Sequence, residues 1–347
     1  MPAPAANGNP DFPVESPLSG LVPGHPALLV ARRFTPMEAA NALYSEACSE
    51  VPEAIVASLS RQVFDTDLPQ PSSGFRRWMA RAIFRILKRT TRPEIRTEPD
   101  GSEVSIFRNR ILEQSKHPYA MTLLQPSNGD SSSFVEGGDP MNAPYMMILP
   151  EIRQNAATWD KLFLDSVIGK DVQLRFVWET RITHEIASRQ LKRGEPVRLK
   201  AAAAGTGLSL VLVYDRLIRE GYDPEMITAT ITDRAAANIT KSRRLLESLA
   251  STRANITQDG NGFGISAHVE DLLQFGTSGD KSLHIVTLVG ILEYFHGFTV
   301  TTTEESLGHS AAVEEHDATD VLRKIGEVTA ECGVLIANTY RTETGAR

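Results

Sequence analysis

The pattern of apolar and polar positions is clearest in the second half of the chain, where short β-branched runs alternate with amphipathic stretches. Strands are predicted where apolar runs are short and rich in Val and Ile, and helices where apolar residues recur at helical spacing. The predicted strands are 197–203, 226–232, 264–269, 283–289 and 333–338, and the predicted helices between them are 208–220, 235–250 and 317–331. This alternation predicts an α/β fold with a parallel sheet that is covered on both faces.

The pattern before residue 196 predicts mainly helices. Those at 36–50 and 52–64 begin with proline, which the first turn of a helix tolerates. Helical spacing also predicts helices at 75–92, 156–168 and 172–191, and a short strand candidate, E-V-S-I-F-R-N, lies within 100–125. We therefore expect a flexible tail over 1–20, a mainly helical cap over 21–195, and a sheet domain over 196–347.

A polar, glycine-rich stretch at 127–140 is predicted to be a long loop. Long loops within compact proteins are usually functional lids or disordered segments. Phe134 lies in this loop, and Asn142 and Tyr145 follow it in a more apolar stretch at 141–150. These three side chains could close over a ligand, or Phe134 could simply anchor an ordinary surface loop.

Composition and charge narrow the possible partners. The 347 residues suffice for two domains, and the formal net charge of −7 argues against a surface that binds nucleic acid. The segment 75–92 mixes Arg and Lys with apolar residues, which fits either an anionic or membrane partner or a helix with one core face; the acidic total favours the core face. No apolar run is long enough to span a membrane, and Cys48 and Cys332 have no metal-ligand spacing, so we expect a cytoplasmic protein.

Candidate ligand-binding residues lie where the predicted strands end. The first strand runs into V-R-L-K-A-A-A-A-G-T-G, in which Gly205 and Gly207 allow a sharp turn and a close approach of the backbone to a nucleotide. The second strand ends at Asp233, where an acid can hold ribose hydroxyls. The alternative for Asp233 and for Asp271 is an acid at the start of a helix, which the helix dipole favours.

Four segments in this order, A-A-A-A-G-T-G, I-T-D-R, H-V-E-D-L and I-V-T-L-V-G-I-L-E-Y-F, resemble the sequential motifs of class I S-adenosylmethionine-dependent methyltransferases. The resemblance implies a Rossmann-like sheet and S-adenosylmethionine as cofactor, with no metal. By this resemblance the methionine and ribose lie on the glycine turn, the ribose hydroxyls bind Asp233, and the adenine lies at Asp271. The cofactor-binding set that it implies is Ala203, Gly205, Thr206, Gly207, Asp233, Arg234, Glu270, Asp271, Leu272 and Gly290, with Tyr294 near the sulfonium.

The chain departs from the family pattern in two places. Ala201 stands where the family usually has an acid that helps to hold the methionine amino group, so we expect another segment, such as the cap, to hold that end. The sixth and seventh strands of the family are not visible after the fifth predicted strand. Either further chain supplies them or the sheet is completed otherwise.

Two reactions fit these residues. In one, a small-molecule acceptor takes the methyl group and S-adenosylhomocysteine is released. In the other, the methionine amine attacks its own γ-carbon, which gives azetidine-2-carboxylate and methylthioadenosine. The chain is similar overall to bacterial azetidine-2-carboxylate synthases of specialised metabolism, and this favours the cyclisation.

For the cyclisation, aromatic faces can stabilise a sulfonium, which makes Phe134, Tyr145 and Tyr294 candidate catalytic residues. Asn142 is the fourth candidate, because it could close over the ligand. A regulator that binds S-adenosylmethionine without turnover is a third hypothesis. The sequence predicts no oligomeric state.

Overall fold

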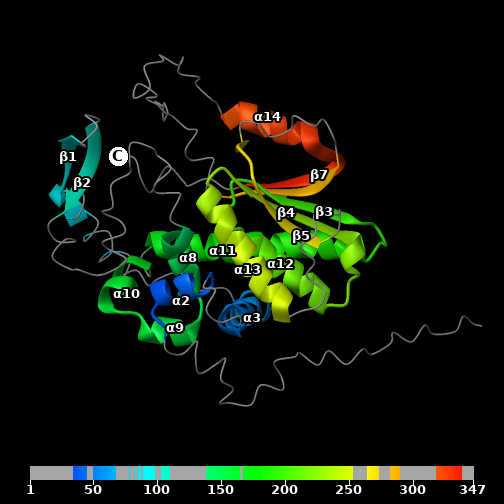
Figure 1. Cartoon of the computed structure of the whole chain (residues 1–347), viewed down its shortest axis with the longest axis horizontal. Coiled ribbons are helices and arrows are strands. Elements are labelled where there is room, and N and C mark those ends of the chain that lie inside the picture. Colours follow the sequence, from blue (N-terminus) through cyan, green and yellow to red (C-terminus); the bar gives the residue numbers. More distant parts are fainter. Residues whose placement is uncertain are drawn as a thin grey trace, which may run out of the picture.

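The computed structural model describes residues 34–44, 50–67, 89–97, 103–109, 138–164, 167–252, 264–272, 282–289 and 318–337, together with a few positions between 78 and 86. Its centre is a five-stranded sheet in which every neighbouring pair is parallel, in the order β5-β4-β3-β6-β7 (Figure 1). The strands are β3 (Val197–Ala201), β4 (Ile227–Asp233), β5 (Gly264–Val269), β6 (Leu283–Leu288) and β7 (Thr329–Ala337). The order by position along the chain is 3-2-1-4-5, which is Rossmann-like and confirms the predicted α/β sheet.

Helices cover both faces of the sheet, as the continuous apolar strands require. On one face lie α11 (Val167–Leu191), α12 (Leu208–Arg219) and α13 (Ala236–Thr252), and on the other lies α14 (Ala318–Val328) (Figure 1). Strand side chains alternate between two apolar clusters: Leu199 and Ile285 join the first, whereas Val286 and Leu288 pack with Val321 of α14 in the second. The predicted helix 172–191 begins five residues earlier, at Val167.

The last strand begins earlier than its sequence suggests. The predicted helix 317–331 ends at Val328, and β7 starts at Thr329 instead of residue 333. Thr329 pairs with Leu283, and the register then shifts before Val334 pairs with Ile285. Cross-strand pairing with β6 therefore extends this strand by four residues beyond the apolar run.

The N-terminal helices differ from the prediction in their bounds. The described helices are α2 (Pro36–Ala42), α3 (Glu50–Asp65), α9 (Pro150–Asn155) and α10 (Thr158–Leu164). Thr35 and Glu38 form a reciprocal capping box at the start of α2. The predicted helix 36–50 instead ends at Ala42, and the predicted helix 52–64 extends over Glu50–Asp65. The predicted helix 156–168 begins only at Thr158, because Ala156 has an extended conformation, and it ends at Leu164.

Part of the expected loop 127–140 is helical. Gly138–Met146 forms α8, although it contains Pro144, while residues 127–137 lie outside the described part of the chain. The buried side chains of Asn142, Ala143 and Met146 give this helix tertiary contacts that outweigh its poor helix propensity.

The structure contains a two-stranded antiparallel sheet, of which only one strand was predicted. β2 (Glu103–Asn109) coincides with the predicted strand, whereas its partner β1 (Thr91–Thr97) overlaps the end of the predicted helix 75–92. Most of that cationic stretch lies outside the described residues. Trp78 and Ile86, two of its apolar positions, are helical and exposed, so the predicted core face is not buried there.

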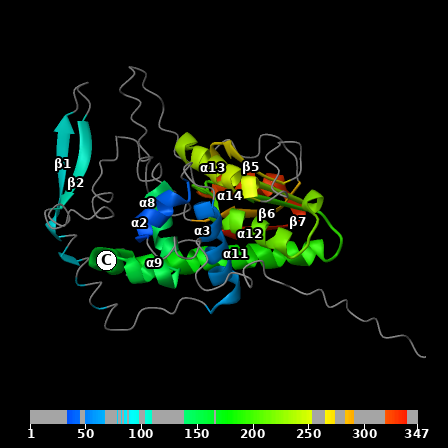
Figure 2. The same cartoon turned by 60° about the horizontal axis from the view of Figure 1, so that its bottom comes forward.

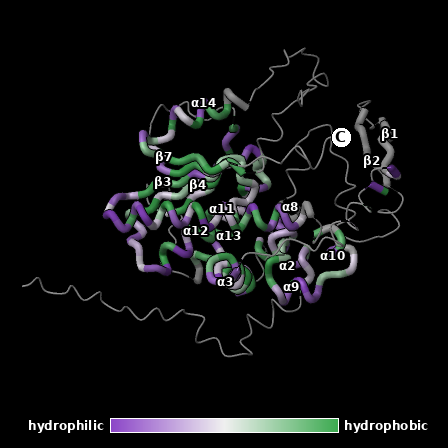
Figure 3. Tube along the Cα trace, turned by 180° about the vertical axis from the view of Figure 1, so that it is seen from behind, coloured by the Kyte–Doolittle hydropathy of each residue, from purple (hydrophilic) through white to green (hydrophobic). Residues whose placement is uncertain are grey.

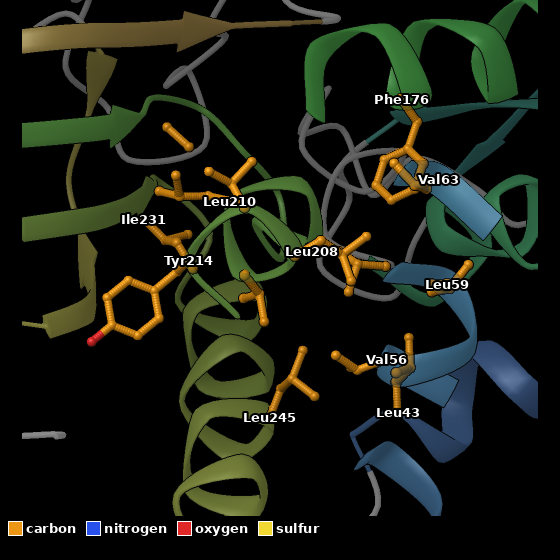
Figure 4. Close-up of a cluster of buried hydrophobic side chains, with 14 of the residues drawn as sticks. Leu43, Val56, Leu59, Val63, Phe176, Leu208, Leu210, Tyr214, Ile231 and Leu245 are labelled. Carbon is orange, nitrogen blue, oxygen red and sulfur yellow. The ribbon is translucent and has the colours of Figure 1, made fainter. Parts of the chain in front are cut away.

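One apolar core joins the N-terminal helices to the sheet layer. Leu43, Val56 and Leu59 lie beside Leu208 of α12 and Leu245 of α13 in Figure 4, and all five side chains are buried. Figure 2 shows α3 alongside α12 and α11 from a second direction. Figure 3 shows a largely hydrophobic trace through the sheet and a mixture of hydrophobic and hydrophilic positions along helices such as α12 and α3.

Candidate functional site

The turn between β3 and α12 has left-handed backbone at three positions. The φ values are +48° at Ala203, +58° at Gly205 and +61° at Gly207. A Cβ on Gly207 would lie 2.5 Å from Cγ2 of Ile231, so glycine is required there for packing as well as for conformation. A Cβ on Gly205 would meet nothing within 4 Å. The turn therefore offers an open backbone surface at Gly205, where a ligand can approach closely.

Asp233 holds this turn from the end of β4. One of its carboxylate oxygens, Oδ2, accepts from the Gly205 N–H at 2.7 Å, and the other, Oδ1, accepts from the Ala235 N–H at 2.8 Å. The Asn238 amide also donates to Oδ1, at 3.3 Å. Burial raises the pKa of Asp233, against the effect of these hydrogen bonds.

The bond to Ala235 gives Asp233 a structural role near the start of α13, which was the alternative considered for this acid. A carboxylate has about four lone-pair positions. Ribose binding by Asp233 therefore stays a prediction alongside this role.

Two side chains from the N-terminal helices contact the turn from the other side. The Tyr44 hydroxyl, just after α2, donates to Oγ1 of Thr206 at 2.8 Å. The Asn142 amide of α8 donates to the Tyr44 hydroxyl at 2.6 Å and lies 3.1 Å from Oγ1 of Thr206. All three side chains are buried. The structure thus brings the predicted residues Asn142 and Thr206 together across 64 residues of sequence.

Tyr145 lies one turn further along α8 than Asn142 and packs on an aromatic ring of α11. Its ring and that of Phe176 are stacked, with centroids 4.1 Å apart and an interplanar angle of 14°. Phe176 is buried and Tyr145 is partly exposed. This contact fixes one face of the Tyr145 ring against α11.

A carboxylate of α11 also reaches the carboxyl end of the sheet. Glu179 accepts a hydrogen bond at 2.8 Å from Oγ of Ser209, the second residue of α12. Its second hydroxyl partner is the side chain of Thr287 in β6. Burial raises the pKa of Glu179, while these hydrogen bonds and the nearby Arg175 act in the opposite direction.

Glu270 and Asp271, the two acids that follow β5, have different surroundings. Glu270 forms an ion pair with Lys200 of β3, with Nζ–Oε2 at 2.6 Å, and its N–H donates to the Asp233 carbonyl. Asp271 is partly buried, and Leu272 is buried in the apolar cluster on the α14 side. Arg234 is exposed beside Asp233. The predicted contacts of Asp271 and Leu272 with an adenine ring stay predictions, as does cofactor binding by Arg234 and Glu270.

The remaining predicted residues, Phe134, Gly290 and Tyr294, lie outside the described residues. Sequence reasoning missed Tyr44 and Glu179, which lie 162 and 30 residues from the partners that they contact. Neither residue belongs to a motif. The available signal was Ala201, which predicts that another segment, such as the cap, holds the methionine amino group.

The residues of the turn fit an adenosine-type ligand on two counts: the open backbone at Gly205, and a rigid carboxylate behind it. Among the described residues no group of three or more His, Cys, Asp or Glu side chains could hold a metal ion. Within the same residues no helix is both long and apolar enough to cross a membrane.

Comparison with known proteins finds no matching family model and no matching curated protein. Among solved structures, the chain is similar to the DszA carbon methyltransferase, with 12% identity, 90% of this chain and 77% of that chain covered, and a TM-score of 0.35. It is also similar to the CurJ carbon methyltransferase, with 13% identity, 89% and 81% covered, and a TM-score of 0.34.

A third similar structure is the PH0226 protein from Pyrococcus horikoshii OT3, with 16% identity and a TM-score of 0.26. The match covers 45% of this chain and spans 56% of that protein. Such low TM-scores carry no argument about reaction or substrate. The Rossmann-like fold rests instead on the strand order of this chain.

Proposed function

We propose that this chain is an S-adenosylmethionine-dependent methyltransferase that acts on a small-molecule acceptor. The observation that carries the proposal is the construction of the glycine turn at the carboxyl end of β3. Asp233 fixes Gly205 from the sheet side, and Tyr44 and Asn142 fix Thr206 from the N-terminal helices. Ligands of parallel α/β sheets bind at this edge.

The chain's own residues supply alignment and exclusion of water. S-adenosylmethionine, when bound, supplies an already activated methyl group, so the protein needs little acid or base chemistry of its own. The open side of Gly205 admits the nucleoside part of the ligand, and the buried pair Tyr44 and Asn142 closes the N-terminal side of the turn. An acceptor would then enter between the N-terminal helices and the sheet edge.

The test is a binding and product experiment on the whole chain. Calorimetric titration with S-adenosylmethionine and S-adenosylhomocysteine should show saturable binding, and incubation with S-adenosylmethionine and pools of candidate acceptors should release S-adenosylhomocysteine. Absence of binding to both ligands would overturn the proposal. Binding without any product would favour a regulator.

Cyclisation of the ligand is the second candidate. Two observations favour it: β3 ends in Ala201, without a carboxylate, and the stacked pair Tyr145 and Phe176 lies near Asn142. In this reaction the neutral amine nitrogen forms a bond to the γ-carbon, the bond from that carbon to sulfur breaks, and methylthioadenosine leaves with the electron pair. The one proton released overall is the one that the ammonium loses before the attack, and the ring nitrogen of the product is an ammonium.

The same incubation separates the two reactions. With S-adenosylmethionine alone, equal amounts of azetidine-2-carboxylate and methylthioadenosine above the non-enzymatic background would establish cyclisation. Methyl transfer predicts neither product above background, and S-adenosylhomocysteine only when an acceptor is present. We place methyl transfer first, because it is the ordinary reaction of the family that the sequence motifs resemble.

A further inference from the structure

A carboxylate of α11, which precedes the sheet layer in the chain, lies close to the alanine that ends β3. Ala201 pairs with Thr287 of β6, and the next residue, Ala202, donates its N–H to the Thr287 carbonyl at 2.9 Å. The Thr287 side chain is a hydrogen-bond partner of Glu179. The end of β3 has no carboxylate of its own, but the carboxylate of Glu179 from α11 therefore lies close to it.

Alternation along the strands places these groups on the same face of the sheet. Val197, Leu199 and Ala201 belong to the apolar cluster on the α11 side, and so does Ile285, two residues before Thr287. Successive strand side chains point to opposite faces, so Ala201 and Thr287 both face α11. Helix α11 contacts both β3 and β6.

The same carboxylate also adjoins the glycine turn. Ser209, whose hydroxyl donates to Glu179 at 2.8 Å, lies two residues after Gly207. Glu179 thus lies between the end of the sheet and the first turn of α12. Any ligand seated on the turn has this carboxylate on its α11 side.

The surroundings of Glu179 leave room for a further hydrogen-bond donor. Its known partners are two neutral hydroxyls, with the guanidinium of Arg175 one helical turn away. A carboxylate can accept about four hydrogen bonds, so these hydroxyls leave acceptor capacity. Glu179 is partly buried, and a hydrogen bond between an ammonium group and a carboxylate is stronger than one between neutral groups.

We propose that Glu179 holds the amino group of the methionine half of S-adenosylmethionine, in place of a carboxylate at the end of β3. This inference rests on the proposed function, because an adenosine-type ligand without an amino acid has no ammonium to offer. A carboxylate at this position keeps the amine charged. It therefore opposes attack by the amine and suits methyl transfer rather than cyclisation.

The test compares two ligands that differ by the amino-acid half. S-adenosylhomocysteine carries the ammonium, and methylthioadenosine lacks it. Calorimetry should show that Glu179→Gln weakens binding of S-adenosylhomocysteine about 10- to 100-fold, the usual range for a hydrogen bond to a charged group. Binding of methylthioadenosine should change less than about twofold, because its contacts do not include Glu179.

Two further variants separate the charge from the fold. Glu185→Gln on the same helix removes an exposed carboxylate that pairs with Arg189, and it should bind both ligands like the wild type. Glu179→Asp keeps the charge on a shorter side chain and should recover part of the lost affinity. Thermal unfolding of each variant verifies that the protein is folded before titration.

The outcomes distinguish this inference from the function on which it rests. If the wild type binds S-adenosylhomocysteine and Glu179→Gln binds it equally well, the role of Glu179 is wrong while the proposed function stands. An equal loss of affinity for both ligands would also overturn it, because the effect would then be structural. If the wild type binds neither ligand, the proposed function fails and this inference fails with it.

Discussion

Single residues decide how closely a ligand can approach the turn after β3. Gly205 and Gly207 both have positive φ, but only Gly207 is closed in by a neighbour, the Ile231 side chain. Gly205 faces open space. The two glycines therefore have different purposes, one for packing and one for access.

Gly205→Ala tests this division. The left-handed backbone should cost the variant about 1 kcal/mol of unfolding free energy, because alanine tolerates positive φ poorly. A methyl group on the open side should also reduce the affinity for S-adenosylhomocysteine by at least about tenfold. Chemical denaturation measures the first effect and calorimetry the second.

Gly221→Ala is the matched control for that experiment. Gly221 has φ of +84° and no atom within 4 Å of an added Cβ, but it lies at the far end of α12. Its substitution should cost a similar amount of stability and leave ligand affinity unchanged. Equal affinity losses in the two variants would contradict an access role for Gly205.

At the scale of elements, hydrogen bonds connect helices that are far apart in the sequence. Tyr44 after α2 and Asn142 of α8 meet Thr206 of the turn. His184 of α11 meets Glu220 at the end of α12, where Arg216 also pairs with the same carboxylate. Each contact ties a separate helix to the element that positions the turn.

The cap contact predicts energetic coupling between Tyr44 and Asn142. Tyr44→Phe and Asn142→Ala should each destabilise the protein by about 1 to 3 kcal/mol, because a buried polar partner is left unsatisfied. The double variant should lose less than the sum, with a coupling energy of at least about 0.5 kcal/mol. Denaturation of the four proteins in the cycle measures this coupling.

A comparison variant makes the cap experiment specific. Tyr222→Phe removes a hydroxyl at the far end of α12, and it should combine additively with Asn142→Ala. Additivity between Tyr44→Phe and Asn142→Ala would instead mean that their hydrogen bond carries no energy of its own.

The contact between α11 and α12 at Glu220 predicts a pH-dependent contribution to stability. Burial raises the pKa of Glu220, but hydrogen bonds from His184 and Arg216 outweigh it, so the pKa lies below its ordinary value. The folded state therefore binds this proton less readily than the unfolded state, whose Glu pKa is about 4.3. The stabilisation is full above that value and is lost as the pH falls through the folded pKa.

Glu220→Gln should accordingly destabilise the protein at about pH 6 and do so by less at about pH 3.5. The difference is expected to be below about 1 kcal/mol, since the carboxylate is partly exposed and screened by solvent. Urea denaturation of both proteins at the two pH values measures it. A gap that does not narrow at low pH would show that ionisation of Glu220 contributes nothing.

At the scale of the whole molecule, the N-terminal helices and the sheet layer share one apolar core. Leu59 of α3 and Leu245 of α13 are both fully buried in it, and α3 contacts both α12 and α13 (Figure 4). The predicted cap and sheet domain are therefore held together by side-chain packing as well as by the chain. A boundary at residue 195 stays a prediction.

This shared core predicts that the described layers unfold together. Leu59→Ala and Leu245→Ala should each lower the stability by about 2 to 5 kcal/mol and shift one and the same thermal transition. Calorimetry with each variant measures the number of transitions and their midpoints. A transition that Leu59→Ala shifts and Leu245→Ala leaves in place would mean that the α3 layer unfolds separately.

The sequence by itself determined the elements of the sheet layer and the place of the glycine turn. Five β-branched runs alternate with helical ones, and their apolar patterns allow only a parallel sheet with two covered faces. The turn glycines and Asp233 could also be found in the sequence, because a Gly-x-Gly turn followed by an acid at the end of the next strand is typical of nucleotide-binding α/β folds. These signals are local, so a single segment carries them.

Only the tertiary structure decided which distant residues meet at that turn. Tyr44 and Glu179 carry no local signal, since their meaning depends on partners 162 and 30 residues away. The helix at Gly138–Met146 was hidden for the same reason: its prolines and glycine predict a loop, and its buried face overrides them. The local pattern determines which secondary structures a segment can form, whereas packing against other segments determines which of them it adopts and which residues it contacts.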